Sequence, residues 1–229
     1  MGKYKLGIIG GMGPMASVVL YEMITEKTPA EKDQDHIDMV ILNHASMPDR
    51  TSVILSKDEA AIESVLNEFR SDLKILKDAG CESFVVTCNT AHFFVDKLQQ
   101  EGELELEPIH LIKETARACK EAGGKIAILA TDGTIQSGLY QNELDKLGVE
   151  HYEPSEELQG KIMSLIYDYV KAGKSVPAQL WRDIEDELKA KNCAHAILGC
   201  TELSVEKRRD DNPFYINPFV TVCEKIVRK

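Results

Sequence analysis

The chain has 229 residues, enough to bury one large core or two small ones. Its composition, 43% hydrophobic and 28% charged, is typical of a soluble globular protein, and no apolar run reaches the length of a transmembrane helix. The net charge of −11 argues against nucleic acids and anionic membranes as partners, because both need concentrated positive charge. An acidic metabolite can still bind where a few cations line a pocket.

The six cysteines are expected to be free thiols in a cytoplasmic protein. The chain begins without a signal-peptide segment, and no cysteine or histidine spacing is typical of a zinc site. A free cysteine is most often a small buried hydrophobe, and we interpret four of the six in this way. These four are Cys81, Cys119, Cys193 and Cys223.

The first elements predict an α/β unit that opens with a glycine turn. A strand at 5–9 breaks into Gly10-Gly11-Met12-Gly13-Pro14, and a helix follows at 15–27. Ala16 stands where the dinucleotide fingerprint requires its last glycine, which argues against a dinucleotide. Exposed amides of the glycines, with a proline near the first helical turn, suit a carboxylate instead.

The next elements predict a cation near the same edge of the sheet. A strand at 36–42 is followed by a loop that contains Arg50, and an amphipathic helix covers 59–79. Ligands of open α/β sheets bind beyond the carboxyl ends of the strands, so Arg50 is expected to reach the ligand. The alternative is a solvated arginine paired with Asp49.

Two strands each end in a cysteine. The strand at 84–87 leads into Cys88-Asn89-Thr90-Ala91-His92, and the strand at 196–199 leads into Cys200-Thr201-Glu202. Both cysteines therefore fall at the edge where α/β sheets bind ligands. Cys88 and Cys200 are the leading candidates for chemistry.

The second half repeats the design of the first. Residues 125–137 match residues 5–17 at a lysine, an apolar strand, a glycine and a serine, which predicts an internal duplication. Lys161 lies on a helix that starts near Ser155, at a point comparable with Arg50; a solvated helix lysine is the alternative. We expect the last helix, 219–228, to return to the first half.

These motifs resemble the aspartate/glutamate racemase superfamily, most closely its cofactor-independent aspartate racemase branch. The matching segments span almost the whole chain: 10–14, 48–51, 87–92 and 199–203. The resemblance implies two pseudo-symmetric α/β domains with parallel-type sheets, an active site in the cleft between them, and a homodimer. We expect the first domain to comprise 1–102 with 211–229, and the second to comprise 103–210.

The resemblance also implies residue roles. Cys88 and Cys200 correspond to the two acid/base catalysts. Side chains that match the family's binders of the substrate's α-carboxylate and amine are Asn89, Thr90 and Thr201. Arg50 matches the guanidinium that receives the substrate's side-chain carboxylate, and Lys161 resembles the family's second cation. Further residues expected to line the pocket are Met12, Thr134 and Ser137. Two departures from the family pattern are Met15, after the glycine turn, and Asn217-Pro218, where an aspartate is common.

We therefore expect a racemase that interconverts L- and D-aspartate, with glutamate as the alternative substrate, and needs neither pyridoxal phosphate nor metal. Each cysteine serves one face of the α-carbon, and strand-end cysteines beside helix N-termini are expected to have a lowered thiol pKa. Rival interpretations within the superfamily are a hydantoin racemase, a maleate isomerase or an arylmalonate decarboxylase. A non-catalytic two-lobed binding module is the rival from another class.

Overall fold

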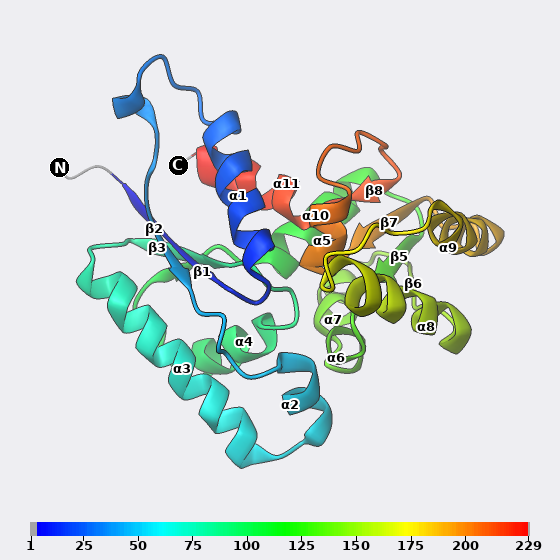
Figure 1. Cartoon of the computed structure of the whole chain (residues 1–229), viewed down its shortest axis with the longest axis horizontal. Helices are drawn as coiled ribbons and strands as arrows, with labels where there is room; N and C mark the ends of the chain where they lie inside the picture. Colours follow the sequence, from blue (N-terminus) through cyan, green and yellow to red (C-terminus); the bar gives the residue numbers. More distant parts are fainter. Residues whose placement is uncertain (1–3, 229) are drawn as a thin grey trace.

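The computed structural model describes residues 4–228, which form two parallel four-stranded sheets flanked by helices (Figure 1). The strand orders are β2-β1-β3-β4 and β6-β5-β7-β8. The two orders are the same pattern, since each half pairs its first strand with its second and third and places its fourth at the far edge. The expected α/β fold with two parallel sheets is confirmed, and the repeated topology agrees with an internal duplication.

The first sheet contains β1 (Lys5–Gly10), β2 (Asp38–Asn43), β3 (Ser83–Val86) and β4 (Glu107–Pro108). All four residues of β3 are buried, as expected for a central parallel strand covered on both faces. One face packs on α1 (Pro14–Lys27), and the other packs on α3 (Glu59–Asp78) and α4 (His92–Gln100). Short segments α2 (Arg50–Ser56) and η1 (Asp33–Asp35) complete this half.

The second sheet contains β5 (Ile126–Leu129), β6 (His151–Tyr152), β7 (His195–Leu198) and β8 (Tyr215–Ile216). Its core lies between two helical layers. The helices that pack on one face are α5 (Leu111–Ala122) and α7 (Leu139–Lys146). The segments on the other face are α8 (Glu156–Ser164), the π-helical η2 (Leu165–Val170), α9 (Ala178–Ala190) and α10 (Thr201–Glu206). The short helix α6 (Asp132–Gln136) follows β5.

The last helix, α11 (Pro218–Val227), returns to the first half as expected. It packs against both α1 and α5, and its buried face shares a cluster with Leu6 and Ile8 of β1. Asn217, which departs from the family pattern, caps this helix because its side chain accepts a hydrogen bond from the Phe219 amide at 2.9 Å.

Sheet membership differs from the expected domain boundaries at both junctions. β4 pairs with β3, so residues just beyond 102 still belong to the first sheet. β8 pairs with β7, so residues just beyond 210 still belong to the second sheet. Both strands have only two residues, too few for a hydrophobic pattern to reveal them. Among residues 4–228, no helix combines the length and apolar character that crossing a bilayer requires.

Candidate active site

Cys88 lies at the carboxyl end of β3, beside the glycine turn that follows β1. Ser17 joins the two segments, since its hydroxyl accepts from the Gly11 amide at 3.2 Å and bonds the Thr87 hydroxyl at 3.1 Å. A Cβ on Gly10 would lie 1.8 Å from the Ser17 oxygen, so only glycine allows this approach. The turn therefore packs closely on the strand end, and Cys88 keeps 6% of its surface exposed.

Cys200 begins α10 at the corresponding end of β7 and is also 6% exposed. Its thiol donates to the Glu202 carboxylate, with Sγ 2.8 Å from Oε2. Burial, and then the negative charge of Glu202, raise the pKa of Cys200 well above its usual value. This corrects the expectation of a lowered pKa, because the position beside a helix start is outweighed by burial next to a carboxylate.

Lys171 supplies a cation beside the Cys200–Glu202 pair. It follows the π-helical segment η2, and its Nζ lies 2.7 Å from Glu202 Oε1. Burial acts to lower the pKa of Lys171, but Glu202, Cys200 and Cys88 together raise it. Lys171 thus lies within electrostatic reach of both cysteines. π-Helical segments are frequent at functional sites, but this one has no signature that the sequence reveals.

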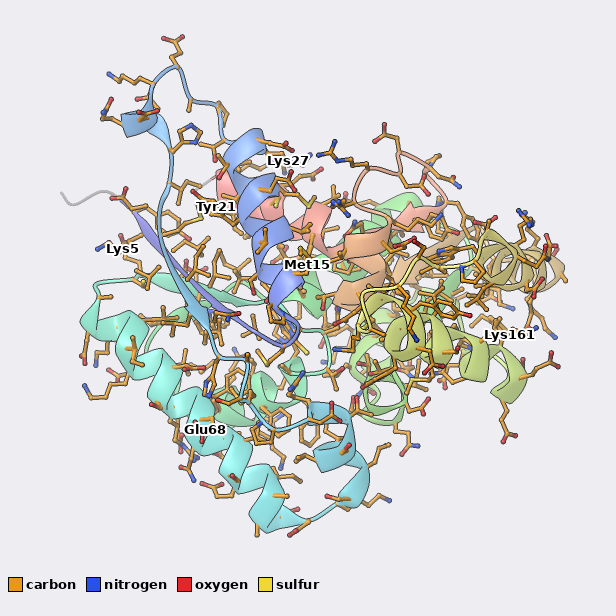
Figure 2. All side chains as sticks on the ribbon, in the orientation of Figure 1. Lys5, Met15, Tyr21, Lys27, Glu68 and Lys161 are labelled. Carbon is orange, nitrogen blue, oxygen red and sulfur yellow. The ribbon has the colours of Figure 1, made fainter. Side chains whose placement is uncertain are left out.

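Lys161, the second cation expected from the sequence, lies on the surface of α8. Figure 2 shows Lys161 at the outer end of this half of the molecule. Its Nζ is 3.1 Å from Glu157 Oε1, one helical turn away. Such a pair is the solvated helix lysine that we considered as the alternative. The structure therefore brings Lys171, rather than Lys161, to the cysteines.

Arg50 is buried and faces the glycine turn. It is the first residue of α2 rather than part of a loop, and it is 9% exposed. Its guanidinium donates to the carbonyls of Met47 (3.1 Å), Pro48 (2.9 Å) and Met12 (3.1 Å). Nε is buried and has no hydrogen-bond partner within residues 4–228. The alternative interpretation, a solvated arginine paired with Asp49, is wrong. Arg50 is buried, and the Asp49 carboxylate accepts from the Ser52 amide and hydroxyl.

Asn89 presents a second buried donor without a partner. The Tyr140 hydroxyl, from α7 of the other half, donates to Asn89 Oδ1 at 2.6 Å and so fixes the orientation of the amide. Asn89 Nδ2 has no partner within the described chain, although Asn89 is only 1% exposed. Buried donors are nearly always satisfied in folded proteins, so unpaired ones next to reactive residues indicate a ligand that accepts hydrogen bonds.

Two of the predicted threonines, Thr90 and Thr134, lie at the junction between the two halves. Thr90 Oγ1 lies 3.0 Å from Thr131 Oγ1 and 2.9 Å from Thr134 Oγ1, so these hydroxyls bond each other across the junction. Thr201, next to Cys200, donates to Glu202 at 3.3 Å. Ser137 donates to the Thr134 carbonyl and lines a cavity that contains neither cysteine. The sequence pattern thus found residues of the junction, but it did not reveal that most of their hydroxyls bond one another.

That cavity, of about 670 Å³, opens between α4, α5 and α7 and contains neither cysteine. Its lining includes three lysines, at 97, 113 and 146, two of which pair with neighbouring carboxylates. Size alone does not make this cavity the active site, because the two candidate cysteines and the unpaired donors lie elsewhere. No cluster of three or more histidine, cysteine or acidic residues within 4–228 is arranged to hold a metal ion.

Comparisons with known proteins find amino-acid racemases. The sequence is 25% identical over 207 residues to a broad specificity amino-acid racemase of Bacillus subtilis, covering 87% of this chain and 86% of that protein. The structure is similar to aspartate racemase from Picrophilus torridus, with a TM-score of 0.80, 28% identity, and coverage of 99% and 94% of the two chains. Glutamate racemase of Francisella tularensis, solved with D-glutamate, has the same fold at a TM-score of 0.70 and 17% identity, with 99% and 80% covered.

The family pattern of Asp/Glu/Hydantoin racemases matches residues 9–221, which is nearly the whole chain. This stretch includes the glycine turn, Arg50, both cysteines and Lys171. The chain belongs to the Asp/Glu/Hydantoin racemase family and is an isomerase of the racemase type.

Proposed function

We propose that the protein interconverts L- and D-aspartate by a two-base transfer of the α-proton, without pyridoxal phosphate. The observation that carries the proposal is the pair of cysteines at equivalent strand ends, with Lys171 in reach of both. A racemase must remove a proton from one face of the α-carbon and deliver one to the other face. Two thiols, one from each half, can do this without turning the substrate over.

The environment of Cys200 supports a first role for each thiol. Cys200 has a raised pKa and donates to Glu202, so it begins as the protonated acid. Cys88 is then the thiolate that takes the α-proton and becomes a thiol. Cys200 protonates the opposite face and becomes a thiolate, and the roles are exchanged for the other enantiomer. Lys171 stabilises the negative charge as it passes from one thiol to the other.

The unpaired donors favour a dicarboxylic amino acid. Asn89 Nδ2 can donate to the α-carboxylate, since Tyr140 already holds the amide oxygen. Arg50 is a buried cation with an unpaired Nε, which suits the second carboxylate. The hydroxyls of Thr90, Thr134 and Thr201 remain candidates to contact the substrate once it displaces their present partners. Similarity to an aspartate racemase supports aspartate, and glutamate is the runner-up.

The deciding experiment is α-proton exchange in deuterated water for a panel of L- and D-amino acids. We expect dialysed enzyme, without added pyridoxal phosphate or metal, to label aspartate and to convert each enantiomer to the other. Cys88→Ala and Cys200→Ala should keep the circular dichroism of the parent and lose racemisation. Full interconversion by either folded variant refutes the two-base assignment.

The same panel separates the rival functions. Exchange on a hydantoin but not on aspartate identifies the hydantoin branch, and turnover of maleate or an arylmalonate identifies the isomerase or decarboxylase. Binding of aspartate without exchange at its α-carbon identifies a binding module. The similarity to a broad specificity racemase makes neutral amino acids a necessary part of the panel.

We also propose that the protein assembles as a homodimer through the face formed by α1 and β2. The first two turns of α1 bury apolar residues on the core side and also expose apolar residues on the outer side, where Met15, Val18 and Tyr21 are 59%, 57% and 45% exposed. A helical stretch with apolar side chains on both sides is normally covered on both sides. Beside it, β2 is an edge strand (Figure 1). Ile41 of this strand is 41% exposed.

A second copy suits this face because of charge. Residues 10–21 contain no charged side chain in a protein whose net charge is −11, so two copies meet there with the least repulsion. Val18→Lys combined with Tyr21→Lys should convert a dimer to a monomer in sedimentation velocity. Leu55→Lys is the matched control, since Leu55 is also exposed but lies on α2. A monomeric parent at micromolar concentration contradicts the proposal.

Six free cysteines, two of them proposed as catalysts, favour a reducing compartment. We therefore propose a cytoplasmic location, which fractionation of the native host would test.

A further inference from the structure

His92 belongs to the strand-end segment that contains Cys88, but the mechanism above gives it no role. It is the first residue of α4 and only 1% exposed. Both ring nitrogens have partners: Nδ1 lies 2.8 Å from the Cys88 carbonyl oxygen, and the Leu111 amide donates to Nε2 at 3.1 Å. One buried ring thus connects the main chain of a catalytic residue to the start of α5.

These partners fix the tautomer of His92. An amide N–H can only donate, so Nε2 accepts and carries no hydrogen. The neutral ring therefore has its hydrogen on Nδ1, which donates to the Cys88 carbonyl. Burial, and then the neighbouring His110, lower the pKa of His92 to about 3, so the ring stays neutral at working pH.

The far end of this connection is itself held in place. His110 caps α5, accepting from the Lys113 amide at 3.3 Å, and its Nε2 donates to Asp96 of α4 at 3.1 Å. Lys113 Nζ also reaches Asp96, at 3.2 Å. The rings of His92 and His110 pack edge to face with centroids 4.4 Å apart. The N-terminus of α5 and the first turns of α4 are therefore one hydrogen-bonded unit.

This unit spans the two halves of the molecule. Cys88 follows β3 of the first sheet, whereas α5 packs on β5 and β7 of the second, through Ile112, Ala116 and Cys119. Two-base catalysis requires both thiols at fixed positions on opposite faces of one carbon, where an error of about 1 Å can cost roughly a hundredfold in rate. A tie between the Cys88 main chain and the second half serves that requirement.

Building on the racemase function proposed above, we propose that His92 is a positioning residue. As a neutral imidazole, it ties the carbonyl of Cys88 to the first turn of α5 and so holds the Cys88 thiol in register with the half that carries Cys200.

Two substitutions separate the two bonds. His92→Asn keeps a donor near the Nδ1 position and loses the acceptor for Leu111, whereas His92→Gln keeps an acceptor near Nε2 and loses the donor to Cys88. We expect kcat for aspartate to fall about a hundredfold in His92→Gln and about tenfold or less in His92→Asn. KM should change by less than about twofold, because Arg50 and Lys171 are untouched.

His195→Gln is the matched control. Its Nδ1 also bonds a main-chain carbonyl, that of Pro213 at 2.9 Å, but it lies at the amino end of β7, away from both thiols. We expect parent kcat and KM in this variant.

A second readout does not depend on turnover. Alkylation by iodoacetamide, followed for each cysteine-containing peptide by mass spectrometry, should be at least about fivefold faster at Cys88 in His92→Gln and unchanged at Cys200. Parent alkylation and parent kcat in folded His92→Gln overturn the proposal. The proposal is also overturned if His92→Asn and His92→Gln lose equal activity and this loss tracks their loss of unfolding free energy. That result would indicate a histidine that only stabilises the fold. If the parent racemises no amino acid, the proposed function fails, while alkylation still decides the role of His92.

Discussion

Replacing Lys171 by alanine tests the most specific claim about the site, that this lysine and not Lys161 is the second cation. A unit negative charge, such as a thiolate, about 4 Å from an ammonium gains roughly 4 kcal/mol at an effective dielectric constant near 20. Lys171 is 26% exposed, so solvent screening reduces this to roughly 3 kcal/mol. We therefore expect Lys171→Ala to lower kcat/KM for aspartate about a hundredfold. Lys161→Ala, which removes a surface partner of Glu157, should stay within about twofold.

The assay is circular dichroism of aspartate in both directions, with thermal unfolding to confirm that both variants fold. L- and D-aspartate have equal free energy, so kcat/KM must be the same in the two directions for the parent and for each variant. An equal loss in both directions is thus an internal check on the measurement. Parent kcat/KM in Lys171→Ala, or a large loss in Lys161→Ala, refutes the assignment of the cation to Lys171.

Three further predictions follow from the same geometry. Arg50→Ala should lower kcat/KM for aspartate by at least about a hundredfold, and Arg50→Lys should recover part of this loss. The amino acid alanine should stay a poor substrate for the parent and both variants. Parent activity on aspartate in Arg50→Ala would remove the main support for a dicarboxylic substrate. Glu202→Gln should lower the pKa of Cys200, because a negatively charged neighbour is removed. The pH dependence of Cys200 alkylation measures this pKa. An unchanged value would mean that burial alone raises the pKa of Cys200. His92 has a pKa of about 3 in the fold against 6.5 when exposed, so the unfolded chain binds the proton first and stability falls as pH drops through 6.5. Urea unfolding should show about 1.6 kcal/mol of this loss between pH 6.5 and 5 in the parent and not in His92→Gln, and parallel pH curves for the two proteins contradict it.

The sequence predicted the parts of the molecule that local patterns encode. The cysteines at strand ends follow from two short apolar strands and from the rule that α/β sheets bind ligands at their carboxyl edge. The repeat of lysine, apolar strand, glycine and serine predicted the shared topology that the two sheets display. Arg50 was expected near the ligand, although its place at the start of α2, capped by Asp49, was not recognised.

The remaining features depend on contacts that no local pattern records. Lys171 is one of several lysines near the end of a predicted helix, and only the π-helical turn and the approach to Glu202 distinguish it. Tyr140 orients Asn89 across 51 positions of sequence. Glu202 could have been noticed, since a carboxylate two residues after a catalytic cysteine at a helix start must perturb the thiol or be neutralised by a cation.

The site is symmetric in its thiols and asymmetric in their surroundings. Glu202 and Lys171 pair beside Cys200, whereas the Cys88 carbonyl is held by a neutral histidine. Since the two enantiomers have equal free energy, this asymmetry cannot make kcat/KM larger in one direction. It can only make kcat differ between the two directions, with KM differing by the same factor. Which thiol carries the proton when each enantiomer binds decides that factor. The form with Cys200 protonated is ready to take the α-proton through Cys88, and the opposite form needs Cys200 as a thiolate beside the Glu202 carboxylate. In the proposed mechanism Lys171 makes that second form accessible, because its positive charge offsets the repulsion between the Cys200 thiolate and the Glu202 carboxylate.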